Sequence, residues 1–282
     1  MSNWKRIPST AADVWKMTVP PHPMIAWLGQ AGFIVRAGGS RILIDPYLSD
    51  SLEEKYRGTD KPHPRMMPPP ITVPELLGAD LVLCTHRHTD HMDKQTLSRI
   101  ADLNPACRFV VPRAEMHHAQ SLSLPPDRLV TIDAGEELEA GNIKIRAVPS
   151  AHESLEINER GEHRCLGYIL RLPQVTIYHS GDTVPYEGLA KHLAHEGIGL
   201  ALLPVNGRGK GVAGNLTFGE AVALCREARI PEMIPHHFGM FAFNTIDPDV
   251  LATEAAEIGD IACHVPDTRS SFEFQPATTH SP

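Results

Sequence analysis

The stretch Thr85-His86-Arg87-His88-Thr89-Asp90-His91 is the feature of this 282-residue sequence that decides its interpretation. It follows the short apolar run Leu81–Cys84, a predicted strand, and precedes a predicted helix that Asp93 caps. Loops held by a rigid sheet are where ligand-binding side chains are usually placed. The first two histidines can face one metal ion while the aspartate and the last histidine turn towards a second, and Zn²⁺ accepts such ligands readily. A polar turn with solvated histidines is the alternative, which this specific spacing disfavours.

Two metal ions need more ligands than one loop supplies, so further candidates are expected at other strand ends. Three later polar residues meet this expectation because each follows a predicted strand: His152, Asp182 and His237. Each of them, taken alone, is more typical of an ordinary loop than of a metal site. Their occurrence together, and in this order, favours a shared metal centre.

Apolar runs alternate with helical patterns over most of the chain, which indicates an α/β fold. The predicted strands are Ile25–Leu28, Phe33–Ala37, Arg41–Ile44, Leu81–Cys84, Phe109–Val111, Ile143–Val148, Gly167–Leu172, Val175–Tyr178, Leu200–Leu203 and Met233–Ile234. The predicted helices are Asp93–Ala101, Arg113–Ser121, one from the capping box at Thr217 to Ala228, and one that starts at Asp247-Pro248.

The stretch Ser49–Pro70 is rich in charge and proline and predicts a surface loop. We expect its His63 to be exposed, as we do His22 and His280 in other proline-rich or terminal segments. No linker divides the chain, so the sequence predicts a single domain over residues 1–282, with residues 1–24 as an N-terminal arm.

The composition, with 42% hydrophobic and 21% charged residues, is typical of a globular protein with a sizeable core. The net charge of −8 disfavours a general binder of nucleic acid or anionic membranes, although it leaves room for a locally positive pocket. The start of the chain lacks the apolar segment of a signal peptide and no run is long enough to cross a bilayer, so we expect a cytoplasmic protein. Five scattered cysteines predict buried thiols, and homo-oligomerisation stays open.

Four motifs, THRHTDH, PSAHE, HSGD and PHHF, occur in this order along the chain. They resemble the ligand motifs of the metallo-β-lactamase superfamily. The resemblance implies an αββα sandwich, in which two β-sheets are flanked by helices. It also implies a ligand set, namely His86, His88 and His152 for the first metal, Asp90, His91 and His237 for the second, and Asp182 as the bridge between them.

Two further residues are candidates for a supporting role behind the ligands. Asp45, in Ile44-Asp45-Pro46, is similar to the superfamily's aspartate behind the metal loop. His179 directly precedes the turn that leads to the bridging aspartate, where outer partners of metal ligands are common. His237 is preferred over the adjacent His236 because the family pattern is Pro-x-His followed by an aromatic or polar residue, and His236 stays the alternative.

Within the superfamily, the sequence is similar to the group around L-ascorbate-6-phosphate lactonase, the UlaG-like proteins. The segments that carry this similarity are Trp27–Phe33, His91–Asp93, Tyr178–Asp182 and Ile234–His237. The resemblance implies a lactonase- or esterase-like hydrolase of a small anionic substrate that uses two divalent ions, Zn²⁺ or Mn²⁺. Redox relatives carry glutamate in place of His88, and common zinc β-lactamases carry cysteine in place of Asp182. Both positions therefore favour hydrolysis of a substrate other than a β-lactam.

The expected nucleophile is a hydroxide held between two metal ions, which lower the pKa of the parent water towards neutrality. Asp90 is expected to orient this hydroxide and to pass its proton to the leaving group. The glycine-rich loop that begins at Asn206 follows the predicted strand Leu200–Leu203. There Arg208 can clamp a carboxylate or phosphate with help from Asn206, and a solvated turn is an equally good interpretation.

The principal alternative function is a phosphodiesterase that acts on nucleotides or RNA ends. The sequence has no basic cluster of the kind that binds nucleic acid, which disfavours this alternative. A protein that holds metal without catalysis is a third interpretation, but a chain that had drifted in this way would be expected to lose ligands first. The expected partner is therefore a small anionic substrate, without nucleic acid or membrane.

Overall fold

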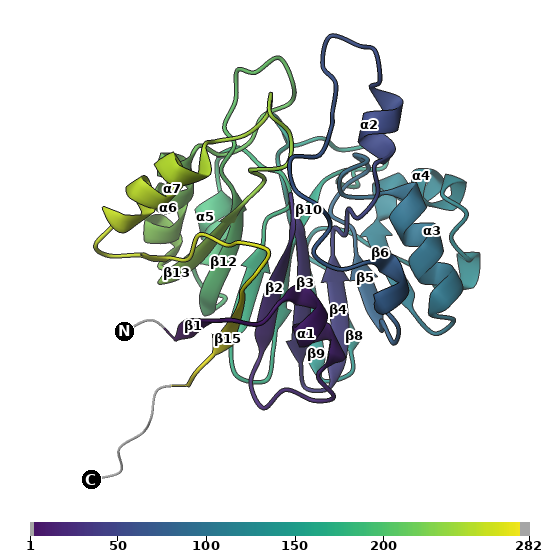
Figure 1. Cartoon of the computed structure of the whole chain (residues 1–282), viewed down its shortest axis with the longest axis horizontal. Coiled ribbons are helices and arrows are strands. Elements are labelled where there is room, and N and C mark those ends of the chain that lie inside the picture. The colour runs from purple at the N-terminus through teal and green to yellow at the C-terminus, as the bar shows by residue number, and fades with distance from the viewer. Residues whose placement is uncertain (1–2, 277–282) are drawn as a thin grey trace.

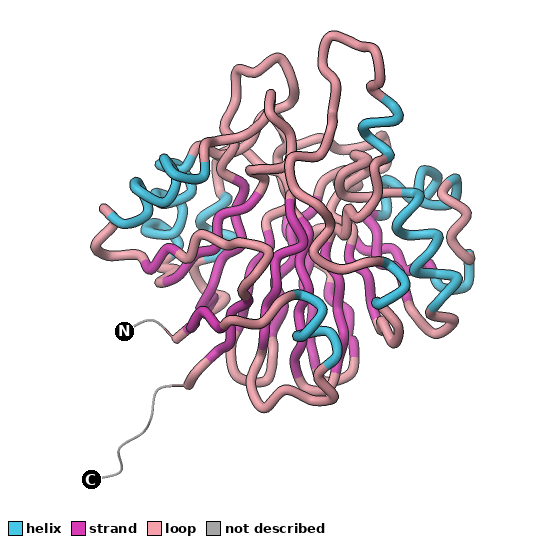
Figure 2. Tube along the Cα trace, viewed as in Figure 1, coloured by secondary structure: helices cyan, strands magenta, loops and turns pink. Residues whose placement is uncertain are grey.

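The computed structural model describes residues 3–276, whose strands form two mixed β-sheets packed face to face with helices on the outside (Figures 1 and 2). In spatial order the first sheet contains β1 (Trp4–Ile7), β15 (Ser271–Phe274), β2 (Met24–Gly29), β3 (Gly32–Ala37), β4 (Ser40–Ile44), β5 (Leu81–Leu83), β6 (Arg108–Pro112) and β7 (Leu129–Ile132). The second contains β14 (Ala262–Cys263), β13 (Glu232–His236), β12 (Ile198–Pro204), β11 (Thr176–His179), β10 (Leu166–Arg171), β9 (Ile143–Pro149) and β8 (Glu137–Ala140).

The helices cover the two outer faces, so the architecture is the predicted αββα sandwich (Figure 1). They are α1 (Ala11–Lys16), α3 (Lys94–Leu103), α4 (Met116–Ser121), α5 (Leu189–Leu193), α6 (Phe218–Ala228) and α7 (Pro248–Ala256), with single 3₁₀ turns at Val73–Glu75, Arg113–Glu115 and Pro126–Arg128. Helix α2 (Ser51–Lys55) lies instead among the loops at the top of Figure 1. None of the helices in residues 3–276 is long and apolar enough to span a membrane.

Two large clusters of buried apolar side chains hold these layers together. The larger fills the space between the sheets and continues under α5 and α6, with Trp27 and Phe33 from the first sheet and Tyr168 from the second. The other lies between the first sheet and the helices α1 and α3. Burial of this apolar surface is the main driving force for the sandwich.

The strand directions place several loops at one edge of the sandwich. Strand β4 runs parallel to β5, and β11, β12 and β13 run parallel to one another. Strand β9 has the direction of β11, because both are antiparallel to β10. The carboxyl ends of these strands therefore meet where the loops rise at the top of Figure 1, which is where ligands usually bind in such sheets.

Most predicted elements are present, and the capping predictions at Asp93, Thr217 and Asp247 are confirmed by hydrogen bonds that their side chains accept from backbone amides of the first helical turn. The predicted helix Arg113–Ser121 begins as a 3₁₀ turn and becomes α-helical at α4. The predicted loop Ser49–Pro70 contains helix α2.

The segment expected as an N-terminal arm is part of the sandwich. Strand β1 pairs with β15 from the end of the chain, and α1 packs on β2 and β3. Trp4 is 1% exposed and lies edge-on to Phe274, and Trp15 is 2% exposed and donates its indole N–H to the Leu77 carbonyl. The two tryptophans thus pack on the domain, because it offers each ring an apolar site.

Candidate metal centre

All seven predicted metal ligands lie together at the edge where the strand ends meet. They come from four loops, which follow β5, β9, β11 and β13. The first triplet consists of His86, His88 and His152, whose candidate ligand atoms all lie within 4.8 Å of one another. Within it, Nε2 of His152 lies 3.1 Å from Nδ1 of His88. Three imidazole nitrogens converging in this way match the nitrogen donor set of a zinc site.

The second triplet consists of Asp90, His91 and His237, and it meets the same 4.8 Å criterion. The carboxylate of Asp182 lies between the triplets: its oxygens are 3.4 Å from Nε2 of His91, 3.1 Å from Nε2 of His237 and 3.7 Å from Nε2 of His152. This side chain therefore lies within reach of histidines from both triplets.

The polar atoms of this cluster fit a bound cation. Nε2 of His86, Nε2 of His91 and Oδ1 of Asp182 are buried and have no hydrogen-bond partner within the described residues. Leaving a buried polar atom unsatisfied costs about 1–3 kcal/mol, so several such atoms facing one another need an explanation. Metal ions coordinated by these atoms would satisfy them, whereas an apolar ligand would not.

Asp45 fixes the orientation of His91 from behind. Its carboxylate is fully buried and accepts hydrogen bonds from Nδ1 of His91 at 2.7 Å, from the Thr85 amide at 2.8 Å and from the Thr85 hydroxyl at 2.6 Å. Because Nδ1 of His91 donates a hydrogen bond to Asp45, Nε2 is the nitrogen that faces the cluster. Such a carboxylate–histidine pair is the usual outer support of a metal-bound imidazole.

The electrostatics of the cluster keep Asp182 ionised and His91 protonated when no cation is bound. Burial lowers the pKa of His86, and the neighbouring His91 and His88 hold it well below its usual value. Burial raises the pKa of Asp182, but His237 and His91 outweigh this effect and hold it well below the usual range. Burial also lowers the pKa of His91, yet Asp182, Asp45 and Asp90 outweigh it and hold that pKa well above its usual value. A proton at His91 thus compensates the carboxylates, and a cation would replace it.

Three non-glycine residues at the centre have a left-handed backbone, which costs energy and is often retained at functional sites. They are Gln30 (φ 51°), Asp45 (φ 43°) and His237 (φ 63°). The Gln30 carbonyl accepts a hydrogen bond from the His237 amide, and Nε2 of Gln30 donates to Oδ2 of Asp90 at 2.8 Å. The sequence did not mark Gln30 as a site residue, although it lies in Trp27–Phe33, one of the segments similar to the lactonase group.

The structure separates the two histidines after β13. His237 lies in the cluster, whereas His236 is fully buried in the core with its ring stacked on His179 at 4.9 Å. His179 donates from Nε2 to the Ala31 carbonyl and accepts from the Gly181 amide at Nδ1. It thereby holds the turn that carries Asp182 into the cluster.

The two predicted substrate-binding residues lie apart from the ligands. Arg208 forms an ion pair with Glu220 and donates to the Asn215 carbonyl, and it does not line the pocket over the metal cluster. Asn206 is 3% exposed and donates from Nδ2 to Oδ1 of Asn244, which does line that pocket. Arg208 is thus turned towards the capping box of α6, where the nearest carboxylate neutralises its charge.

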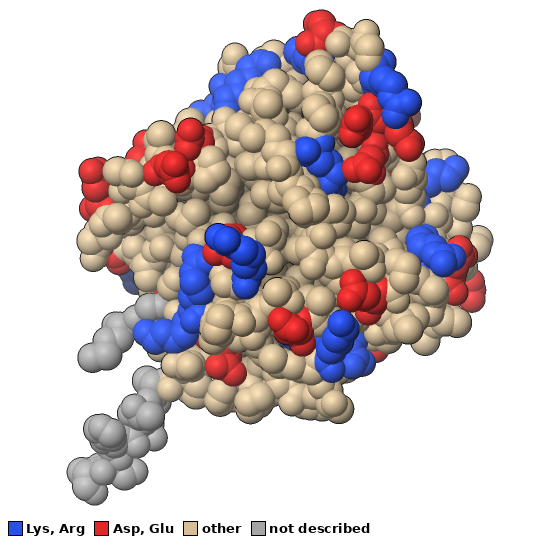
Figure 3. Space-filling view, in the orientation of Figure 1, with Lys and Arg blue, Asp and Glu red and all other residues tan. Residues whose placement is uncertain are grey.

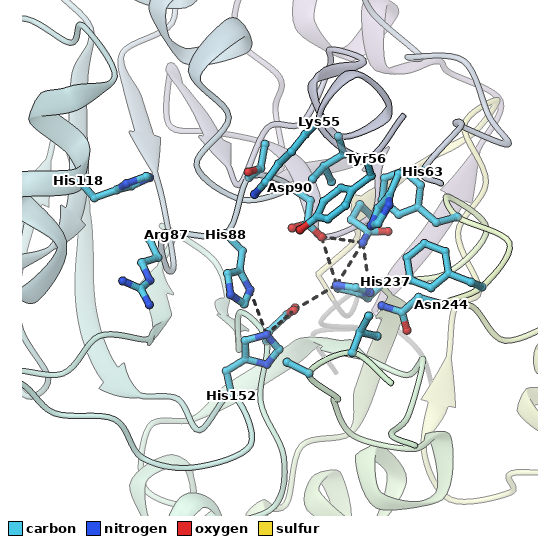
Figure 4. A pocket seen from close by; sticks show the side chains of 18 residues that line it. Lys55, Tyr56, His63, Arg87, His88, Asp90, His118, His152, His237 and Asn244 are labelled. Atoms are coloured by element: carbon cyan, nitrogen blue, oxygen red, sulfur yellow. Dashed lines mark hydrogen bonds and ion pairs between the residues drawn. The ribbon is translucent and has the colours of Figure 1, made fainter. Parts of the chain in front are cut away.

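The expectation that His63 is exposed is wrong, because the ring is 9% exposed and lines the pocket. It stacks on Tyr56 at 4.2 Å between ring centres (Figure 4). It also contacts Phe243 edge-on at 4.5 Å. No local pattern marks the contact with Phe243, because that ring comes from a segment far along the chain. His22 is half-buried, which also departs from the expectation, and His280 lies outside the described residues.

The sequence matches the model of the beta-lactamase superfamily domain over residues 40–238, and the chain belongs to this superfamily. It is 28% identical over 247 residues to the UPF0173 metal-dependent hydrolase of Myxococcus xanthus. The matched region covers 84% of this chain and 78% of that protein. The chain is also 28% identical over 183 residues to the uncharacterized protein Rv0906 of Mycobacterium tuberculosis, of which it spans only 48%.

A solved structure supports the fold independently of sequence similarity. Igni18, a novel metallo hydrolase from the hyperthermophilic archaeon Ignicoccus hospitalis, has a TM-score of 0.65 to this chain at 20% identity. The likeness covers 90% of this chain and 99% of that one. At this level of identity the likeness concerns the fold alone.

Proposed function

We propose that this protein is a metal-dependent hydrolase that binds two divalent ions, Zn²⁺ or Mn²⁺, and cleaves a small anionic ester or lactone. The observation that carries the proposal is the position of the Asp182 carboxylate between two ligand triplets. The name of the Myxococcus xanthus relative supports a metal-dependent hydrolase. The ester or lactone substrate rests on the resemblance to the ascorbate-phosphate lactonase group.

Bound at these residues, divalent ions would supply Lewis acidity and lower the pKa of a coordinated water molecule. The protein contributes Asp90, whose Oδ2 accepts a hydrogen bond from Nε2 of Gln30. This contact orients the carboxylate. In the proposed reaction Asp90 takes a proton from the attacking water and delivers it to the leaving-group oxygen. Asp45 keeps His91 aligned throughout without touching the substrate.

A substrate screen tests this proposal. Protein loaded with Zn²⁺ or with Mn²⁺ is incubated with chromogenic carboxylic esters, lactones and phosphodiesters, beside EDTA-treated protein and the Asp182→Asn variant. We expect hydrolysis of an ester or lactone that EDTA abolishes and metal restores. Turnover of phosphodiesters alone would favour the nucleotide phosphodiesterase instead. Two bound ions without turnover of any of these substrates would contradict the proposal.

A further inference from the structure

A pocket of about 560 Å³ opens directly over the metal centre, a size typical of small-molecule sites (Figure 4). Ligands from both triplets line its floor, among them His88, His152 and His237. Two other sets of side chains line the pocket without being candidate ligands. One set is aromatic and the other is cationic.

The aromatic wall consists of Tyr56, His63, Phe241 and Phe243. His63 stacks on Tyr56 and meets Phe241 and Phe243 edge-on, at 5.1 and 4.5 Å between ring centres. Phe241 and His63 are buried behind, whereas Tyr56 and Phe243 are only half-buried. The wall thus presents aromatic surface to whatever enters the pocket.

The wall is held in place without a ligand. Phe241 belongs to a small apolar cluster of its own, with Tyr47, Leu52 and Met240, against which Tyr56 and Phe243 pack. Nδ1 of His63 donates to the Lys61 carbonyl at 2.7 Å. Between the two segments that supply the rings, the Met66 amide donates to the Met240 carbonyl at 2.9 Å. A ligand therefore meets ordered rings, which reduces the entropy lost on binding.

The cationic residues are Lys55 and Arg87. Both are exposed, and neither forms an ion pair within residues 3–276. On the face shown in Figure 3, basic and acidic side chains are interspersed. An unpaired guanidinium at the rim of a pocket is suited to a carboxylate or phosphate. In Figure 4 Arg87 and the labelled wall residues Tyr56 and His63 lie on different sides of His88.

We propose that the pocket selects small anions that carry an aromatic ring, with the ring packed on the aromatic wall and the anionic group near Arg87 and the metal centre. This inference rests on the proposed function, since it names the substrate class of the same centre. Aromatic pairs gain from their edge-to-face or offset geometry beyond the area they bury, so a planar ring is preferred to a saturated one.

Three phosphonates test the preference, because their carbon–phosphorus bond is not an ester and resists hydrolysis. Benzylphosphonate carries the ring, cyclohexylmethylphosphonate a saturated ring of similar size, and methylphosphonate none. Titration calorimetry on Zn²⁺-loaded protein should give a Kd for benzylphosphonate about tenfold below that of methylphosphonate and clearly below that of the cyclohexyl probe. Equal affinities for the benzyl and cyclohexyl probes would overturn the proposal.

Substitutions in the aromatic wall and at Arg87 show which side chains cause the benzyl preference. Tyr56→Ala and Phe243→Leu should each reduce the benzyl preference several-fold, whereas Tyr56→Phe, which keeps the ring, should retain it. Arg87→Gln should weaken all three probes alike, and Arg99→Gln, at an exposed position on α3, should change none. A preference that survives both Tyr56→Ala and Phe243→Leu would overturn the proposal. Thermal unfolding of each variant shows whether it is folded, and Tyr56→Phe and Phe243→Leu retain most of the side-chain volume.

The outcome is separable from that of the proposed function. The wall contains no candidate metal ligand, so the benzyl preference should persist in EDTA-treated protein, with weaker affinity for every probe. A benzyl preference without hydrolysis of any screened ester would leave this inference standing and remove the proposed activity. Hydrolysis of a screened ester without a benzyl preference in binding would support the proposed activity and overturn this inference.

Discussion

The fully buried carboxylate of Asp45 fixes the orientation of His91, a fully buried imidazole of the ligand cluster. It accepts three hydrogen bonds, two from Thr85 and one from His91. The left-handed backbone of Asp45 is the conformation that points this side chain at both partners. Asp45 thus sets the orientation of the His91 ring, whereas His91 itself supplies the candidate ligand atom.

The variant Asp45→Asn tests this division of roles. The amide keeps the size but places an N–H group against either Thr85 or His91, so His91 loses its charged acceptor. We expect the affinity for Zn²⁺ to fall about 10- to 100-fold, as is usual for outer partners of metal ligands. Competition with a chelator of known affinity measures it. Unchanged affinity would show that Asp45 serves only the fold.

Asp90 carries a different prediction, because it faces the pocket. We expect Asp90→Asn to lower kcat by about 10²–10⁴ through lost acid–base assistance, while the fold survives. Turnover of the best substrate from the screen and metal content are measured together. Asp127→Asn, at an exposed position, is the matched control and should leave both unchanged. Normal turnover of Asp90→Asn at full metal content would rule out the proposed role.

At the scale of elements, the turn after β11 shows how closely the two sheets approach the centre. Gly181 has φ 62°, and a Cβ added there would lie 2.8 Å from Cβ of Thr85 and 2.9 Å from the Leu166 carbonyl oxygen. The turn is thus wedged against the metal loop of the first sheet. Only a residue without a side chain fits.

We expect Gly181→Ala to destabilise the protein and to move Asp182 out of the cluster. Gly197→Ala is a close control, because Gly197 has φ 64° and nothing within 4 Å of the added Cβ. Gly181→Ala should cost about 1–3 kcal/mol more than the control, the usual penalty of overpacking. Denaturant unfolding measures the difference, and metal content should fall in Gly181→Ala alone. Equal stability of the two variants would contradict the close approach.

At the scale of the whole molecule, the candidate ligands come from both sheets. His86 follows β5 of the first sheet, whereas His152 and Asp182 follow β9 and β11 of the second. A metal bound by all of them would tie the sheets together at one edge. Metal binding and global stability should therefore be coupled.

We expect two ions per chain after loading with excess Zn²⁺ and dialysis. Binding at 1,000 times Kd stabilises by about 4 kcal/mol, so EDTA should lower Tm by roughly 10 °C. His86→Ala should lose metal, whereas His117→Ala, at an exposed position on α4, should not. Elemental analysis and calorimetry provide the two readouts. A stoichiometry of one or less in the unmodified protein would refute the dinuclear centre.

The cysteines give a pH-dependent prediction for the folded molecule. All five are free, and burial raises the pKa of Cys107, Cys165 and Cys225 to about 12. Because the thiolate is the reactive form, a raised pKa keeps these thiols protonated and unreactive at pH 8, and reactivity should increase only as the pH approaches 12. A disulfide reagent at pH 8 should label native protein slowly and all five thiols in guanidinium. The prediction of buried thiols holds for four of the five, and Cys263 is half-buried. Rapid labelling of Cys107, Cys165 or Cys225 in the native protein would contradict their burial.

The sequence alone was sufficient for features whose cause is local. Apolar runs gave the central strands, side chains at Asp93 and Thr217 capped their helices, and a short spacing placed the histidines of one loop together. Propensity, capping and spacing act over a few residues, so they can be recognised without knowing what packs where. The strand-end positions of the later ligands belong to the same class of evidence.

Tertiary structure alone decided which residues from distant segments meet. Strand β1 lies against β15 at the other end of the described chain, His63 is enclosed by Phe241 and Phe243, and Arg208 turns to Glu220 and away from the pocket. These outcomes depend on burial and on the nearest available charge in three dimensions. Local sequence does not encode either, because the partners come from separate segments and are set by how the sheets and loops pack.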